Sequence, residues 1–169
     1  MDIRIETLAP LDCLARMRRG AYPESAPAAW AELSAYIGEA GLKPHAAVGF
    51  GLDPIRGTPP GMLRYLACVA VEEAQIPETL PAHIHRRRIP GGRCAIHRLI
   101  GPYQRMPQLF LAMHEEWYPQ SGELLDFMRP FLEIYVNDPG SVPPEEYITD
   151  LCLPLRERPG EPVDELIGA

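Results

Sequence analysis

The hydrophobic and polar positions of this 169-residue chain repeat one succession of patterns twice. In the first half, four short segments alternate or run apolar in the manner of β-strands, and turn-forming residues bound them. These predicted strands are Ile3–Thr7, Cys13–Met17, Ala46–Leu52 and Leu63–Val71. Between the second and third strands, Trp30, Leu33 and Ile37 recur at three- and four-residue steps, with Pro27 near the first turn and Gly41 at the end. That spacing predicts a helix.

The second half has the same order of elements. Its predicted strands are His85–Ile89, Arg93–Leu99, Phe131–Val136 and Tyr147–Leu155. The predicted helix starts at Pro107 and stops before Pro119, and its apolar stripe consists of Met106, Leu109, Phe110, Met113 and Trp117. Each unit is therefore strand, strand, helix, strand, strand. Two such units predict an α+β fold, in which a mostly antiparallel sheet carries the helices.

Anchor residues at spacings of 81 to 85 positions show that the two halves are copies. The matching anchors are Cys13 with Cys94, Cys68 with Cys152, and Gly20-Ala21-Tyr22 with Gly101-Pro102-Tyr103. A duplication of this size predicts two units related by a pseudo-twofold axis, with a central ligand groove at their junction.

The duplication also sets the expected domain organisation. We expect a single domain over residues 1–155, with repeat one at 1–71, a proline-containing linker at 72–83 and repeat two at 84–155. Residues 156–169 contain two prolines, two glycines and alternating charges, so we expect a flexible tail there.

Composition narrows the possible functions. The net charge is −7, which argues against direct nucleic-acid binding and favours a neutral or cationic small molecule. No apolar run is long enough to span a membrane, and Asp2, Arg4 and Glu6 interrupt the amino terminus, so we expect a cytoplasmic protein without membrane contact. The four cysteines lack metal-ligand spacing and no cofactor fingerprint is present, so we expect no metal and no cofactor.

The residues in which the halves differ are candidates for the chemistry. Glu133 is a carboxylate in an otherwise apolar, aromatic strand, and at a spacing of 85 positions its counterpart is Val48. Strand alternation places Phe131, Glu133 and Tyr135 on one face. Burial there would raise the pKa of the carboxyl group, whereas a glutamate on an exposed strand edge would have no functional meaning.

Aromatic side chains around a buried carboxylate form a site for an organic cation. The candidate ligand-binding residues are Glu133, Tyr135, Trp117, Tyr103, Tyr65 and Phe50. Trp117 and Phe50 have the alternative of simple core packing, while a buried tyrosine hydroxyl needs a hydrogen-bond partner that a ligand or Glu133 can supply.

Several motifs in order resemble one known family. They are Ile89-Pro90-Gly91-Gly92, Gly101-Pro102-Tyr103, Trp117-Tyr118-Pro119-Gln120-Ser121-Gly122, Pro130-Phe131-Leu132-Glu133-Ile134-Tyr135 and Asn137-Asp138-Pro139. This succession, which spans about residues 2–155, is similar to the GyrI-like small-molecule-binding domain, the effector-binding domain of AraC-type and MerR-type transcription regulators. The first copy departs from the pattern, because Gly20-Ala21-Tyr22 replaces the usual Gly-Pro-Tyr.

The resemblance implies a ligand pocket between the two units, with Glu133 at the position of the family's pocket acid. It also implies multidrug binding, that is, ligands that are lipophilic and often cationic. No helix-turn-helix precedes the first predicted strand, so we expect a stand-alone sensor or sequestering protein, with a separate DNA-binding regulator as a possible partner. A first alternative is a hydrolase of strained, cyclopropane-bearing genotoxins, in which Glu133 and Tyr103 would be catalytic. A second alternative is an interaction protein that modulates DNA gyrase. The oligomeric state stays open.

Overall fold

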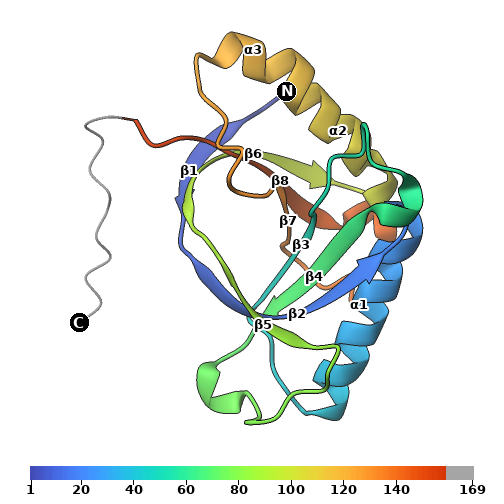
Figure 1. Cartoon of the computed structure of the whole chain (residues 1–169). Helices are drawn as coiled ribbons and strands as arrows, with labels where there is room; N and C mark the ends of the chain where they lie inside the picture. The colour runs from blue at the N-terminus through green and yellow to red at the C-terminus, as the bar shows by residue number, and fades with distance from the viewer. Residues whose placement is uncertain (159–169) are drawn as a thin grey trace, which may run out of the picture.

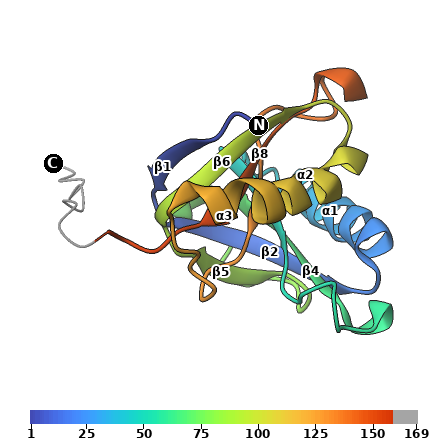
Figure 2. The same ribbon diagram turned by 90° about the horizontal axis from the view of Figure 1, so that it is seen from above.

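The computed structural model describes residues 1–158, which form one eight-stranded antiparallel sheet with helices on its outer side (Figures 1 and 2). The strands are β1 (Arg4–Leu8), β2 (Leu11–Arg19), β3 (Ala46–Gly51), β4 (Arg64–Ala70), β5 (His85–Ile89), β6 (Gly92–Ile100), β7 (Leu132–Tyr135) and β8 (Ile148–Pro154). The helices are α1 (Tyr22–Glu39), α2 (Met106–Ala112) and α3 (Tyr118–Ser121). Single 3₁₀ turns are η1 (Pro60–Met62), η2 (Glu73–Gln75), η3 (Tyr103–Arg105) and η5 (Pro144–Glu146). The predicted α+β class is confirmed.

The second helix is longer than its proline pattern predicts. We expected it to stop before Pro119, but α2 continues through a π-helical turn, η4 (Met113–Trp117), into α3, where Pro119 lies in the first turn. Proline has no N–H to donate, and the wider π turn places it at the start of a new segment, where that donor is not needed. The helix ends at Gly122, whose φ of 69° is the left-handed conformation of a helix C-terminus.

The order of strands in the sheet has the symmetry of the duplication. The order is β1-β6-β8-β7-β3-β4-β2-β5. The counterparts in the two halves are β1 and β5, β2 and β6, β3 and β7, and β4 and β8. When each strand is replaced by its counterpart, the same order results, read from the other edge of the sheet. The pseudo-twofold axis therefore passes between β7 and β3. Each half also lends its first strand to the other, because β1 pairs with β6 and β5 pairs with β2.

The strand register corrects the counterpart of Glu133. Val48 pairs with Cys68 in the first half, and Leu132 pairs with Cys152 in the second. Equivalent residues of these strands are thus 84 positions apart (132 − 48 and 152 − 68). We expected Val48 opposite Glu133 from a spacing of 85, but that spacing belongs to the following loop. The structural counterpart of Glu133 is Gly49.

Three apolar clusters hold the sheet and helices together. The sheet is strongly curled (Figure 1). The first cluster takes residues from both halves and contains all four cysteines, each buried and unoxidised. The second lies between the sheet and α1 and includes Leu33 and Ile37. The third lies between the sheet and α2–α3 and includes Met113. The helices thus cover one face of the sheet, and the cysteines lie on the other.

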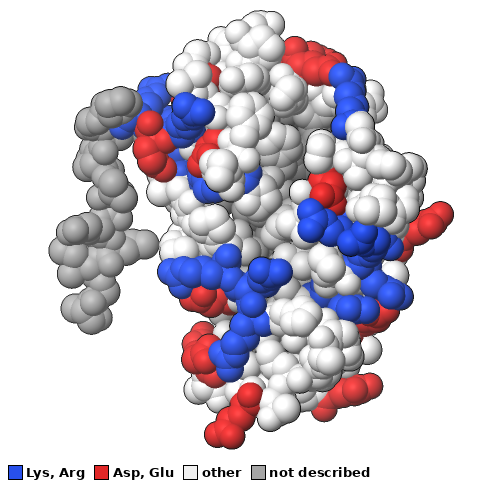
Figure 3. Space-filling view, viewed as in Figure 1, with Lys and Arg blue, Asp and Glu red and all other residues white. Residues whose placement is uncertain are grey.

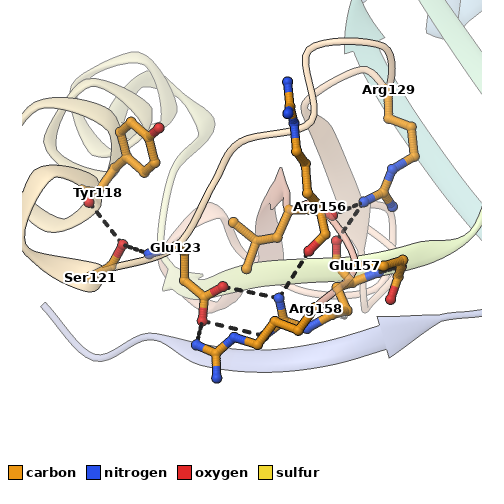
Figure 4. A network of polar contacts seen from close by, with 9 residues as sticks. Tyr118, Ser121, Glu123, Arg129, Arg156, Glu157 and Arg158 are labelled. Atoms are coloured by element: carbon orange, nitrogen blue, oxygen red, sulfur yellow. Dashed lines mark hydrogen bonds and ion pairs between the residues drawn. The ribbon is translucent and has the colours of Figure 1, made fainter. Parts of the chain in front are cut away.

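Polar contacts fix the chain where it leaves β8 (Figure 4). Arg93 and Glu123 form a buried ion pair at 3.0 Å, and the Arg93 guanidinium also donates to the carbonyl of Arg156. The Arg93 amide donates to Glu157, and Arg158 pairs with Glu123. Residues 156–158 of the expected flexible tail make these contacts, and the rest of the expected tail, residues 159–169, lies outside the described residues.

Candidate functional site

Glu133 lies on the pseudo-twofold axis of the molecule. In the β3–β7 ladder it pairs directly with Gly49, which is also its counterpart in the other repeat. Residues that pair across antiparallel strands share a face. Val48 and Phe50, the two neighbours of Gly49 in β3, both belong to the cysteine-containing cluster, so Gly49 and Glu133 lie on the opposite face. The carboxylate therefore projects toward the side of the sheet that carries the helices.

Two tyrosines donate hydrogen bonds to one oxygen of Glu133. The Tyr65 hydroxyl lies 2.7 Å from Oε2 and the Tyr135 hydroxyl lies 2.8 Å from the same atom. The Trp30 indole N–H, which can only donate, lies 3.2 Å from the Tyr65 oxygen. Tyr65 therefore accepts from α1 and gives its own proton to the carboxylate. Among residues 1–158 no side chain hydrogen-bonds the other oxygen, Oε1, and this oxygen is not sealed from solvent.

Gly49 provides the room that this arrangement needs. A Cβ atom at this position would lie 2.0 Å from the Tyr65 hydroxyl and 3.1 Å from Glu133 Oε2. The Tyr65 hydroxyl and the carboxylate oxygen that it binds occupy the space beside Gly49, so a side chain at this position would displace them. The glycine of the first repeat is thus a part of the site built around the glutamate of the second.

The electrostatics of the site are those of a carboxylate without a counter-ion. Among the described residues no Lys, Arg or His forms an ion pair with Glu133. Burial raises the pKa of the Glu133 carboxyl group, and the hydrogen bonds from Tyr65 and Tyr135 only partly oppose this. Burial and the nearby carboxylate also raise the pKa values of both tyrosines, so the two phenols stay protonated donors.

Aromatic rings surround the carboxylate. Trp30 and Tyr103 both meet Tyr135 edge to face, with ring centroids 5.0 and 5.4 Å away. Tyr103 also stacks on Tyr147 at 4.7 Å, and burial raises the pKa of Tyr103 to about 12. Tyr22, the counterpart of Tyr103, lies edge-on to Tyr65 at 6.1 Å. The rings come from both repeats and both helical segments, so they meet at the junction of the two halves.

The structure brings together four of the six predicted site residues. Glu133, Tyr135, Tyr65 and Tyr103 lie in one cluster, although Tyr103 contacts the Tyr135 ring and makes no hydrogen bond to the acid. Phe50 lies elsewhere: it is 6% exposed in the cysteine-containing cluster, on the opposite face of the sheet. Trp117 packs on the third cluster, between α2–α3 and the sheet. For both, the alternative of core packing fits their place.

Sequence reasoning missed Trp30, Tyr22 and Tyr147 as members of this cluster. Its place in the apolar stripe of the first helix indicates core packing for Trp30, but an indole N–H inside a protein also needs an acceptor, which here is the Tyr65 hydroxyl. Tyr22 could have been found from the duplication, because it is the equivalent of Tyr103. Nothing in the sequence pattern pointed to Tyr147.

Two surface depressions have linings that do not include Glu133. One of about 80 Å³ is lined by Asp2, Arg4, Ile96, His97 and Arg98. Another of about 570 Å³ is lined by Arg19, Asp53, Gly57, Thr58, Pro59, Met62 and Arg64. The aromatic rings around the acid contact one another edge to face or stacked. Within residues 1–158 no group of side chains is arranged for a metal ion, and no helix is long and apolar enough to cross a membrane.

Solved structures with the same fold include proteins of several kinds. EcmrR, solved in its DNA complex within EcmrR-RPo, has a TM-score of 0.76 at 14% identity; the match covers 93% of this chain and 58% of that one. SAV2435, solved bound to tetraphenylphosphonium, has a TM-score of 0.61 at 16% identity, with 92% and 94% covered. A hydrolase of Listeria innocua, encoded by lin2189, has a TM-score of 0.58 at 14% identity, with 92% of each chain covered. Likeness at these identities concerns the fold alone.

The family comparison covers nearly all of the described chain. The GyrI-like small molecule binding domain matches residues 1–156, which includes both repeats and every residue around Glu133. The resemblance found in the motifs is thereby confirmed: this chain belongs to the family of GyrI-like small molecule binding domains.

Proposed function

We propose that this protein binds a hydrophobic organic cation, with Glu133 as the counter-ion and the surrounding aromatic rings as the walls of the site. The observation that carries the proposal is a carboxylate on the symmetry axis that has two phenol donors but no cationic partner among the described residues. Such a group is costly to keep ionised, and a bound cation removes much of that cost. Aromatic faces add cation–π attraction.

The ligand class follows from what the site offers and what it lacks. Only Oε1 of Glu133 is open, so the site presents one acceptor and a large aromatic surface. A delocalised cation with a large apolar body suits this better than a small, strongly hydrated ammonium. SAV2435, which has the same fold, was solved with a ligand of this class, tetraphenylphosphonium. A cytoplasmic sensor or sequestering protein for such compounds is the role we infer.

Calorimetric titration with tetraphenylphosphonium tests the proposal, and tetraphenylborate serves as a probe of the same shape and opposite charge. Wild type should bind the cation at least about ten-fold more tightly than the anion, because the Glu133 carboxylate attracts the cation and repels the anion. Glu133→Gln should lose most of that preference. Glu24→Gln removes an equal charge from the exposed first turn of α1 and should leave the preference unchanged.

Two results would contradict the proposal. One is equal affinity of wild type and Glu133→Gln for tetraphenylphosphonium. The other is a similar loss in Glu24→Gln, which would attribute the preference to the overall negative charge of the protein.

Hydrolysis is a second candidate function, favoured by the open Oε1 atom beside two phenols and by the likeness to the Listeria innocua hydrolase. In this case Glu133 would activate water through Oε1, and a tyrosine would protonate the leaving group. Tyr65 and Tyr135 are nearer to the acid than the predicted Tyr103. Mass spectrometry of a cyclopropane-bearing alkylator incubated with wild type, Glu133→Gln and Tyr103→Phe tests this, and a wild-type rate equal to that of buffer would exclude it.

A further inference from the structure

The larger depression, of about 570 Å³, lies at one end of the sheet, on the face opposite the helices. Arg19 ends β2 and Arg64 begins β4, and the two residues pair directly across the ladder. Arg19 and Arg64 are separated from Cys13 and Cys68 by even numbers of positions along β2 and β4. Because side chains alternate along a strand, both arginines lie on the face of the cysteine-containing cluster. The loop before β4 closes the other side with Gly57, Thr58 and the apolar side chains of Pro59 and Met62. Figure 3 shows basic side chains gathered on this face where β2 ends beside η1.

The two arginines differ in their partners. Arg64 is held by Asp53, which accepts from Nε at 2.9 Å, from Nη2 at 2.7 Å and from the Arg64 amide at 2.8 Å. Arg19 forms no ion pair within residues 1–158; its guanidinium contacts the Met62 sulfur at 3.5 Å. Asp53 also interacts electrostatically with Arg19, so two guanidinium groups share one carboxylate and the three side chains keep one net positive charge.

Comparison of the repeats shows that the scaffold does not require these charges. The pair equivalent to Arg19 and Arg64 in the second half is Ile100 with Ile148, which occupy the same positions of the β6–β8 ladder. Like charges directly opposite each other weaken a ladder, so the arginine pair costs stability that the isoleucine pair does not. As with Glu133 and Gly49, the difference between the halves marks a position that packing alone does not explain.

We propose that this depression binds a small organic oxyanion, a phosphate or carboxylate group carried on an apolar body. Arg19 supplies the charge, Arg64 is held in place by Asp53, and the Thr58 hydroxyl is a further donor on the rim. Met62 and Pro59 line the site for the apolar part of the ligand. A volume of about 570 Å³ suits a ligand of this size. This site is separate from that of Glu133, which lies on the other face of the sheet.

Titration with phenyl phosphate, benzoate and inorganic phosphate tests the proposal by calorimetry and by amide chemical shifts. Phenyl phosphate should bind wild type and shift the amides of Gly57 and Thr58, while inorganic phosphate should bind more weakly because it lacks the apolar part. Arg19→Gln should weaken phenyl phosphate at least about ten-fold, as expected for loss of a charged hydrogen bond. The matched control is Arg87→Gln, which removes another exposed arginine without an ion pair in the described chain, from the edge strand β5.

Comparison of phenyl phosphate with benzoate separates a phosphate site from a carboxylate site, and either preference supports an oxyanion. Equal affinities in Arg19→Gln and Arg87→Gln would overturn the proposal, as would shifts in wild type that leave Gly57 and Thr58 unmoved. Glu133→Gln should retain phenyl phosphate binding and Arg19→Gln should retain tetraphenylphosphonium binding, so failure at one site is distinguishable from failure at the other.

Discussion

Replacement of Gly49 by alanine is the sharpest test of how the site is built. The added Cβ atom would lie 2.0 Å from the Tyr65 hydroxyl and 2.9 Å from Tyr65 Cζ, distances that no real contact of this kind shows. Tyr65 is 2% exposed and packed between α1 and the sheet, so its ring has little room to retreat. The substitution should therefore displace the hydroxyl from Glu133 and from Trp30.

The expected magnitude combines two effects. Forcing a methyl group into a packed interior costs about 1–3 kcal/mol. Separating the phenol from the carboxylate loses a hydrogen bond to a charged group, which contributes about 1.5–3 kcal/mol. Relaxation of the strands will recover part of this, so we expect Gly49→Ala to lower the free energy of unfolding by about 2–5 kcal/mol.

Urea unfolding of four variants separates these effects. Gly61→Ala is the control for the residue change, because a Cβ atom there meets nothing within 4 Å. Tyr65→Phe removes the hydroxyl that lies closest to the added methyl. The double variant Gly49→Ala/Tyr65→Phe should be more stable than the sum of the single losses predicts, since the same hydroxyl is involved in both.

Strict additivity in this cycle would refute the reasoning, because it would mean that the methyl group and the hydroxyl do not compete for one space. A Gly49→Ala variant as stable as Gly61→Ala would refute it more directly.

Three further predictions follow from burial and charge. Because burial raises the pKa of Glu133, wild type should lose stability relative to Glu133→Gln as pH rises from the ordinary glutamate pKa of 4.5 through the raised one, and a difference in unfolding free energy that is flat with pH would contradict this. Glu123→Gln removes the carboxylate at 3.0 Å from the buried Arg93 and should cost about 3 kcal/mol in urea unfolding, whereas Glu115→Gln, at the exposed pair with Arg56, should cost less than about 1 kcal/mol. The four buried thiols, whose pKa values burial raises, should react with a disulfide reagent only as fast as the protein unfolds, and rapid labelling of the native protein would show otherwise; they are Cys13, Cys68, Cys94 and Cys152.

Much of the fold could be predicted because the duplication repeats every signal. All eight strands were expected within two residues of their observed ends, and both helices were expected from their apolar stripes. The second helix was predicted too short because Pro119 is ordinarily a stop signal, and a local π turn that accommodates it leaves no mark in the sequence. The pairing of β1 with β6 and of β5 with β2, each across the two halves, could not be predicted from the sequence, because the pairing of edge strands depends on how the whole sheet curls.

The site was predicted in part, because the sequence identified Glu133 but not the register in which its strand, β7, pairs with β3. Alternation was sufficient to place Glu133 and Tyr135 on one face, and the family motifs indicated Tyr103. An alignment off by one residue, however, paired Glu133 with Val48 rather than Gly49. Phe50, two residues beyond Val48, lies on the opposite face of the sheet from Glu133, where core packing accounts for it. A slip of one position reverses every side chain of a strand, and only the observed hydrogen-bond register removes that ambiguity.

The register also explains why this site had to be asymmetric. On a twofold axis, equivalent residues meet each other, and two full side chains at the Gly49–Glu133 pair would compete for the volume that Tyr65 occupies. The next counterparts in the two strands differ in the same way, although they do not pair with each other: Tyr135 pairs with Ala47 and corresponds to Gly51, where a Cβ atom would lie 2.4 Å from the Tyr22 hydroxyl. The first repeat therefore contributes space through two glycines of β3, and the second contributes the acid and a phenol through β7. Two identical halves would have either glycine or glutamate at both positions of this pair. They could therefore supply either the space for the Tyr65 hydroxyl or the carboxylate that binds it, but not both.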